Sequence, residues 1–235
     1  MVEEFLASLF EGVEGIVELL EEGGWDLVSE SGKVGEGGDF SLIVDLKAEE
    51  ILVQKLHRFG EIYTEEQGVI KGKGPRIVID PIDGSFNFKN GIPYFGLSVF
   101  WEEGISFVTN LSNGDYFLRV RGRRERGNLY RPTRNWLPSY REVVIFEKAY
   151  ENPEICRRLT ENQVKFRSPG ALSLSLCYGE EYRGVLFLGK IREFDIAGPY
   201  YYNQHLNWYL NREEGILVMS PKREELERLL KIVKG

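Results

Sequence analysis

The chain has 235 residues, of which 42% are hydrophobic, and it carries a formal net charge of −7. This apolar content is enough for one large domain or two closely joined ones. The negative charge argues against a general affinity for nucleic acid or anionic membranes, and no apolar run reaches the roughly 18 residues that span a bilayer. Because the acidic segment Met1-Val2-Glu3-Glu4 lacks the basic start of a signal peptide, we expect a cytoplasmic protein with neither nucleic-acid nor membrane partners.

The first part of the chain is predicted to hold two helices with a polar loop between them. Apolar residues at helical spacing predict a helix over residues 3–22, and a second helix is expected from Asp45 to about Arg58. The loop at residues 29–41 is rich in Gly, Ser and charge, which is typical of a mobile segment. We expect it to close over a weakly bound metal, as lids do in other enzymes. Asp39 is its candidate acidic contributor, although a simple turn aspartate is favoured there.

Apolar runs then predict a series of strands. A short strand at Ile62-Tyr63 and a buried one at Ile77-Val78-Ile79 precede three strands of one antiparallel sheet, at residues 95–100, 105–111 and 116–120. Residues 121–135 are rich in arginine and could bind phosphate or nucleic acid. A solvated hairpin that crosses between domains is favoured, because the whole chain is acidic. After it we expect strands at residues 143–146 and 184–188, and helices at residues 151–162, 171–177, 197–210 and 221–233.

The segment Asp80-Pro81-Ile82-Asp83-Gly84-Ser85 carries the strongest chemical signal. Two carboxylates three residues apart leave the carboxyl end of a buried strand, Pro81 fixes the backbone between them, and Gly84 permits a sharp turn. A few carboxylates together with substrate phosphate are what Mg²⁺ prefers in proteins. Asp-Pro and Asp-Gly pairs are also common turn formers, so this segment alone leaves a metal site and a plain turn as equal alternatives.

Further acidic side chains lie where loops or helix ends meet apolar strands. They are Asp45, Glu65 and Asp195. Carboxylates that converge without a cation repel one another. Together with Asp80 and Asp83, this set favours a metal cluster over isolated turns.

In four segments the chain resembles the inositol monophosphatase family of Mg²⁺-dependent, lithium-sensitive phosphatases: Asp45–Glu49, Thr64–Glu66, Asp80–Phe88 and Phe194–Gly198. The stretch from Gly37 to Glu49 resembles archaeal members, which act on inositol phosphate and fructose bisphosphate. The resemblance implies an α/β (α+β) fold, a layered αβαβα sandwich, with an N-terminal half over residues 1–128 and a C-terminal half over residues 129–235. It also implies a homodimer that hydrolyses a small phosphorylated substrate.

The resemblance also assigns roles to single residues. It implies two to three Mg²⁺ ions per site, with Asp80 bridging two of them, and the ligands Glu65, Asp80, the Ile82 carbonyl, Asp83 and Asp195. Asp45 and Ser85 would orient and deprotonate the attacking water, with help from Glu65. The implied substrate contacts are Asp83, Gly84, Ser85, Leu172, Arg167 and Arg192. For the two arginines, a contact to a sugar or a second phosphate and a surface salt bridge are equal alternatives.

One departure from the family bears on substrate choice. Seven residues before Asp195, where many members carry Glu and archaeal members carry Arg, this chain has Leu188. Without a polar contact at this point, we expect broad activity on phosphate monoesters. Two alternatives stay open: a related phosphatase acting on a nucleotide 3′-phosphate or NADP, and a phosphatase-like protein that binds or regulates without catalysis.

Overall fold

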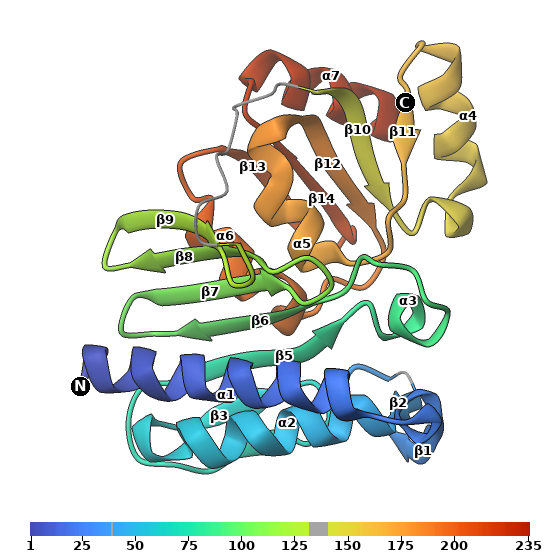
Figure 1. The fold of residues 1–235 in the computed structure, drawn as a ribbon. Coiled ribbons are helices and arrows are strands. Elements are labelled where there is room, and N and C mark those ends of the chain that lie inside the picture. Colours follow the sequence, from blue (N-terminus) through green and yellow to red (C-terminus); the bar gives the residue numbers. More distant parts are fainter. Residues whose placement is uncertain (39, 132–140) are drawn as a thin grey trace.

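Helical layers and β-sheets alternate through the protein (Figure 1). This computed structural model describes residues 1–38, 40–131 and 141–235. Asp39, the candidate acidic contributor of the predicted loop, and part of the arginine-rich segment lie outside the described residues. From the N-terminus the chain runs through a helical layer and a seven-stranded sheet to a five-stranded sheet.

The larger sheet has the strand order β4-β3-β5-β6-β7-β8-β9. β3 and β5 are parallel, and every other neighbouring pair is antiparallel. The three predicted antiparallel strands are confirmed as β6, β7 and β8. The bounds are β3 Ile62–Thr64, β4 Gly68–Ile70, β5 Ile77–Asp83, β6 Gly96–Trp101, β7 Ile105–Asn110, β8 Asp115–Val120 and β9 Arg123–Asn128.

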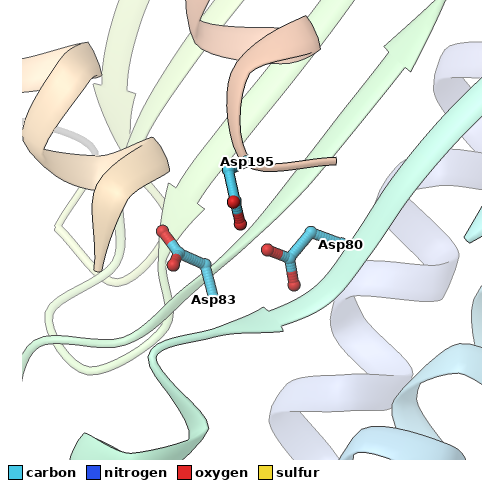
Figure 2. Close-up of side chains that lie close together, drawn as sticks. All are labelled: Asp80, Asp83 and Asp195. Atoms are coloured by element: carbon cyan, nitrogen blue, oxygen red, sulfur yellow. The ribbon is translucent and has the colours of Figure 1, made fainter. Parts of the chain in front are cut away.

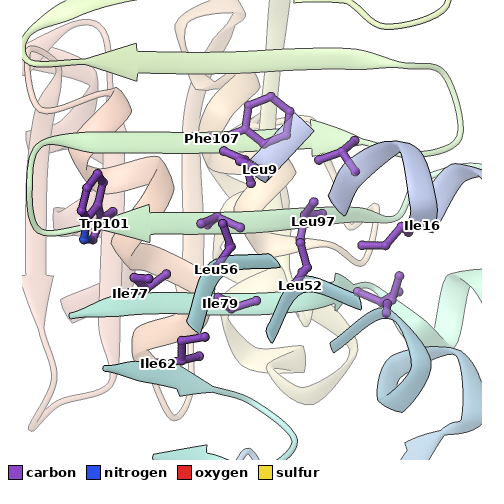
Figure 3. Packing of buried hydrophobic residues seen from close by; sticks show 14 of the residues in the cluster. Leu9, Ile16, Leu52, Leu56, Ile62, Ile77, Ile79, Leu97, Trp101 and Phe107 are labelled. Atoms are coloured by element: carbon purple, nitrogen blue, oxygen red, sulfur yellow. The ribbon is translucent and has the colours of Figure 1, made fainter. Parts of the chain in front are cut away.

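Two long helices, α1 (Val2–Glu22) and α2 (Ile43–Leu56), cover one face of this sheet (Figure 3). They confirm the two helices predicted for this part of the chain. The apolar stripe of α1 is buried because it faces the sheet, and the Phe5 ring stacks on Trp101 with ring centroids 4.2 Å apart. Leu52 of α2 is fully buried in the same cluster. This packing holds β5, the strand that ends at Asp83, in a fixed position.

The smaller sheet has the strand order β11-β10-β12-β14-β13. β10 is parallel to β11 and β12, whereas β14 is antiparallel to β12 and β13. Helices α4 (Pro153–Glu161) and α7 (Arg223–Lys234) cover its outer face. The strand bounds are β10 Arg141–Glu147, β11 Phe166–Arg167, β12 Tyr182–Leu188, β13 Asn207–Asn211 and β14 Ile216–Ser220.

Helices α5 (Leu172–Cys177) and α6 (Glu193–Tyr202) lie between the two sheets (Figure 1). One apolar cluster joins Val108 of the larger sheet, Ile196 of α6 and Val185 of the smaller sheet. The layers therefore follow the order helix, sheet, helix, sheet, helix, and the predicted αβαβα sandwich is confirmed. The larger sheet ends at residue 128 and the smaller begins at residue 141; the division into two domains stays a prediction.

The helix predicted over residues 197–210 is wrong. Helix α6 begins four residues earlier, at Glu193, and ends at Tyr202, and residues 207–211 form β13. The side-chain amide of Asn203 donates to the carbonyl of Leu176 at 2.8 Å and fixes the end of the helix. The segment beyond it pairs with β14, a partner that sequence periodicity does not reveal.

Two polar segments form hairpins. Within the predicted loop at residues 29–41, β1 (Glu30–Val34) and β2 (Phe40–Leu42) pair antiparallel. The described part of the arginine-rich segment pairs β9 with β8, as the hairpin interpretation predicts, and Arg124 there forms an ion pair with Glu180 at 2.8 Å.

The remaining described elements are short. Helix α3 spans Ser85–Lys89, and 3₁₀ helices occur at Trp25–Val28, His57–Phe59, Ala149–Glu151 and Tyr178–Glu181. Within the described residues, no helix has the length and apolar character that crossing a bilayer requires.

Candidate metal centre

Strand β5 is buried from end to end and delivers Asp80 and Asp83 to one edge of the larger sheet. Residues three apart on a regular strand point to opposite faces. The register between β5 and β6 shifts between Asp80 and Asp83, so the strand carries an irregularity there. A shift of this kind re-aims a side chain, and Pro81, which has no N–H to donate, lies within it. Both carboxylates can therefore reach one site.

Asp195 joins this pair from the first turn of α6 (Figure 2). The carboxylates of Asp80, Asp83 and Asp195 point toward one another, and one oxygen of each lies within 4.8 Å of the others. All three are buried, with exposed fractions of 1%, 6% and 3%. Burial and then repulsion from the neighbouring carboxylates raise the pKa of Asp80 well above its usual range, and burial and Asp195 raise the pKa of Asp83 to about 7.

The hydrogen bonds of the two β5 carboxylates differ sharply. Oδ2 of Asp83 accepts the backbone N–H of Ser173 at 2.7 Å and also the Ser173 hydroxyl. Neither oxygen of Asp80 has a hydrogen-bond partner among the described residues. A buried carboxylate without a donor is costly unless a cation compensates it. An all-oxygen donor set of this kind fits a hard divalent cation such as Mg²⁺.

Glu65 faces the same cluster but is held by Arg192. Nη1 of Arg192 donates to Oε1 of Glu65 at 2.6 Å, and its Nε and Nη2 donate to the two oxygens of Asp195 at 3.0 Å. Burial raises the pKa of Glu65, and the Arg192 charge opposes that rise. The sequence left a substrate contact and a surface salt bridge as equal alternatives for Arg192. The structure shows a salt bridge, largely buried rather than on the surface, to two of the proposed metal ligands.

Asp45 and Ser85 come together beside the cluster. The Ser85 hydroxyl lies 2.7 Å from Oδ1 of Asp45 and 2.9 Å from the carbonyl oxygen of Ile82, and either can accept its proton. Asp45 is 2% exposed, and this burial raises its pKa to about 6 although the Ser85 hydrogen bond lowers it. The arrangement can pass a proton from the hydroxyl to a carboxylate near neutral pH.

The turn between β5 and α3 requires glycine at position 84. Gly84 has φ of +90°, and a Cβ there would lie 3.1 Å from the Ala171 Cβ and 3.2 Å from the Gly170 carbonyl oxygen. The turn therefore packs against the loop that leads into α5. This contact sets the start of α3 beside the carboxylate cluster.

A cavity of about 440 Å³ opens over these groups. Most predicted site residues line it: Asp45, Glu65, Asp80, Ile82, Asp83, Gly84, Ser85, Leu172, Arg192 and Asp195. Gly35, Gly37 and Phe40 of the β1–β2 hairpin line it too, and so bring the predicted lid to the site.

Two predicted substrate positions do not reach the cavity. Arg167 is exposed on β11, and its Nη1 donates to the neighbouring Phe166 carbonyl. Leu188 packs in the outer apolar cluster beneath α4 and α7, whereas Phe187 lines the cavity, because successive side chains of a strand face opposite sides. The expectation of broad specificity therefore loses its basis in Leu188.

Sequence reasoning missed residues that support or line the site. Glu49 of α2 is fully buried and accepts the backbone N–H of Glu66 at 3.1 Å, which ties the helix to the turn that carries Glu65. Lys148 and Lys190 line the cavity. Glu49 is the last residue of the Asp45–Glu49 segment that resembles the family, so the sequence could have indicated it. Single lysines in loops show no pattern that would indicate a role.

Comparison with known proteins identifies relatives of this chain. The family model described as "Inositol monophosphatase family" matches residues 2–104. The fructose-1,6-bisphosphatase/inositol-1-monophosphatase of Methanocaldococcus jannaschii is 30% identical over 212 residues, which cover 81% of this chain and 75% of that protein. The fructose-1,6-bisphosphatase of Pyrococcus furiosus is 38% identical over 69 residues, and the Nus factor SuhB of Pasteurella multocida is 34% identical over 104 residues. These two alignments span 28% and 42% of this chain, and 27% and 33% of the relatives.

Solved structures share the fold over nearly the full chain. The crystal structure of the MJ0109 gene product, an inositol monophosphatase–fructose 1,6-bisphosphatase, superimposes with a TM-score of 0.75 at 22% identity and covers 99% of each chain. The crystal structure of the extragenic suppressor protein SuhB from Bartonella henselae superimposes with a TM-score of 0.74 at 20% identity. The match covers 98% of this chain and 99% of that chain. The long alignment to the Methanocaldococcus protein, together with the matching family model, leads to one conclusion: this chain belongs to the inositol monophosphatase family.

Proposed function

We propose that this protein is a metal-dependent phosphatase that hydrolyses a small phosphate monoester, inositol monophosphate or fructose 1,6-bisphosphate being the first candidates. One observation carries the proposal: Asp80 is buried with both carboxylate oxygens unpartnered among the described residues, and it faces Asp83 and Asp195. A cation-binding site made only of oxygens is what a phosphatase of this kind requires. The family and the phosphatase names of its relatives support a phosphoric monoester hydrolase.

The metal ligands in this proposal are Glu65, Asp80, the Ile82 carbonyl, Asp83 and Asp195. Two to three Mg²⁺ ions bound there would acidify a water and neutralise charge on the phosphate. The chain's own residues do the rest. Ser85 Oγ accepts a proton from the attacking water as its own proton passes to Oδ1 of Asp45, a transfer that the 2.7 Å separation supports.

The substrate phosphate is expected at the start of α3. N–H groups in the first turn of a helix have no intrahelical acceptor, so the backbone at Gly84 and Ser85 is suited to hold phosphate oxygens. Leu172 also lines the cavity and would contact the alcohol portion. Lys148 and Lys190 supply positive charge that attracts a second phosphate.

The test is phosphate release from a fixed panel: inositol 1-phosphate, fructose 1,6-bisphosphate, a nucleotide 3′-phosphate and NADP, each with Mg²⁺ and with EDTA. Asp80→Asn should abolish release, and Asp26→Asn, an exposed aspartate in a 3.7 Å ion pair, is the matched control. Faster release from the nucleotide 3′-phosphate or from NADP than from the other compounds would favour the alternative of a related phosphatase with that substrate. Wild-type protein that binds Mg²⁺ and releases no phosphate from any compound would favour the non-catalytic alternative.

Sedimentation of the same preparation tests the expected homodimer.

A further inference from the structure

Arg192 lies inside the carboxylate cluster and is bonded on two sides. Its Nε and Nη2 form a fork to Oδ2 and Oδ1 of Asp195, each at 3.0 Å, and its Nη1 reaches Oε1 of Glu65 at 2.6 Å. The Arg192, Asp195 and Glu65 side chains are 19%, 5% and 14% exposed. The paired fork to Asp195 is a strong charge-assisted interaction, and the separate bond from Nη1 to Glu65 joins residues 127 positions apart.

This arrangement leaves the cluster unevenly neutralised. Glu65 and Asp195 already have a positive partner in Arg192. Asp80, which is 1% exposed, has no hydrogen-bond partner among the described residues, and Asp83 has Ser173 on one oxygen. The need for a further cation is therefore greatest at Asp80.

We propose that Arg192 is an internal cation that competes with a divalent ion for Glu65 and Asp195. The inference rests on the proposed function, since it assumes a metal at Asp80. One ion binds tightly there with Arg192 in place, and a second binds only after the guanidinium leaves Glu65 and Asp195. Because arginine keeps its charge at every working pH, the competition is always present.

The β1–β2 connection packs against this ion pair. A Cβ at Gly37 would lie 2.7 Å from Nη1 of Arg192 and 2.6 Å from Oε1 of Glu65. The Gly37 backbone therefore lies close to the ends of both side chains, and a side chain at position 37 would have to displace the Arg192 or the Glu65 terminus.

The experiment counts bound Mn²⁺ by equilibrium dialysis with metal analysis, and follows free Mn²⁺ by electron paramagnetic resonance. The proteins are wild type, Arg192→Gln, Arg192→Lys and the control Arg223→Gln, whose side chain is 78% exposed on α7. Lys keeps the charge but loses the fork, and it serves as the second variant if Arg192→Gln folds poorly. Arg192→Gln should bind a second Mn²⁺ at least about tenfold more tightly than wild type, with Arg192→Lys between them.

The outcomes separate this inference from the proposed function. Wild type and Arg192→Gln that bind the same number of ions with equal affinity would overturn the inference and leave the metal-dependent function standing. Absence of Mn²⁺ binding in both proteins would overturn both. Arg223→Gln that gains an ion as Arg192→Gln does would also overturn the inference, because the effect would then follow from net charge alone.

Discussion

The hydroxyl of Ser85 donates to Oδ1 of Asp45 across 2.7 Å, although 40 positions separate the two residues in the sequence. The other carboxylate oxygen, Oδ2, accepts the backbone N–H of Leu42 at 2.7 Å. Both oxygens of Asp45 are thereby oriented, one by the start of α2 and one by the turn after β5. A carboxylate fixed in this way is ready to receive a proton from the serine hydroxyl without reorganisation.

Ser85→Ala and Asp45→Asn should each lower kcat for phosphate release by about 10²–10⁴-fold, the usual contribution of a positioned acid–base group. The double variant should be little worse than either single one, because the two residues pass one proton. Steady-state kinetics of the four proteins measures this, with the half-buried Ser31→Ala on β1 as control. Losses that multiply in the double variant would argue against a shared proton path.

The pH profile of the reaction should report Asp45. Its pKa is about 6 because burial raises it, and only the ionised carboxylate accepts a proton, so kcat should fall as the pH drops below about 6. The Ser85 hydrogen bond lowers this pKa, so the acidic limb of the residual activity of Ser85→Ala should lie at higher pH. An acidic limb at the same pH in both proteins would contradict the assignment to Asp45.

The raised pKa of Asp45 also predicts how the free energy of unfolding depends on pH. Between its usual value of 3.8 and about 6, Asp45 binds a proton more readily in the folded than in the unfolded chain. Its contribution to the free energy of unfolding is therefore full below pH 3.8 and is lost as the pH rises through about 6. Urea unfolding in EDTA should show this fall in wild type and a smaller one in Asp45→Asn; identical pH slopes would count against it.

Asp80→Asn should stabilise the metal-free protein while it abolishes metal binding. The substitution keeps the shape and removes a buried charge that has no partner among the described residues. We expect thermal unfolding in EDTA to shift upward by at least about 2 °C. Added Mn²⁺ should stabilise wild type and Asp26→Asn but not Asp80→Asn. A destabilised Asp80→Asn would mean that its carboxylate is satisfied without metal.

Lys190 should set affinity for a second phosphate. It lines the cavity, is exposed, and has no ion-pair partner among the described residues. Lys190→Gln should raise KM for fructose 1,6-bisphosphate by about tenfold, the loss of one charge-assisted contact, with little change for inositol 1-phosphate. Arg167→Gln is the matched control, since Arg167 lies outside the cavity. Equal effects of Lys190→Gln on both substrates would contradict this role.

Much of this protein could be predicted from local sequence. The apolar spacing of residues 3–22 and the alternating runs of β6, β7 and β8 determine their elements, because helical and strand periods differ. The carboxylates of the Asp80–Ser85 segment point to the site only together with the other acidic positions, because Asp-Pro and Asp-Gly pairs also form plain turns. Asp195 was expected where a loop or helix end meets an apolar strand, and it lies in the first turn of α6.

Only the tertiary structure decided which of these groups meet and what charge they share. Leu188 and Arg167 proved distant from the cavity because strand alternation and sheet position determine where a side chain points. Arg192 entered the cluster because α6 starts beside the end of β5, so a guanidinium three residues before Asp195 also reaches Glu65. The balance between one internal cation and several carboxylates depends on distances and burial, and these exist only once the two sheets have packed around α5 and α6.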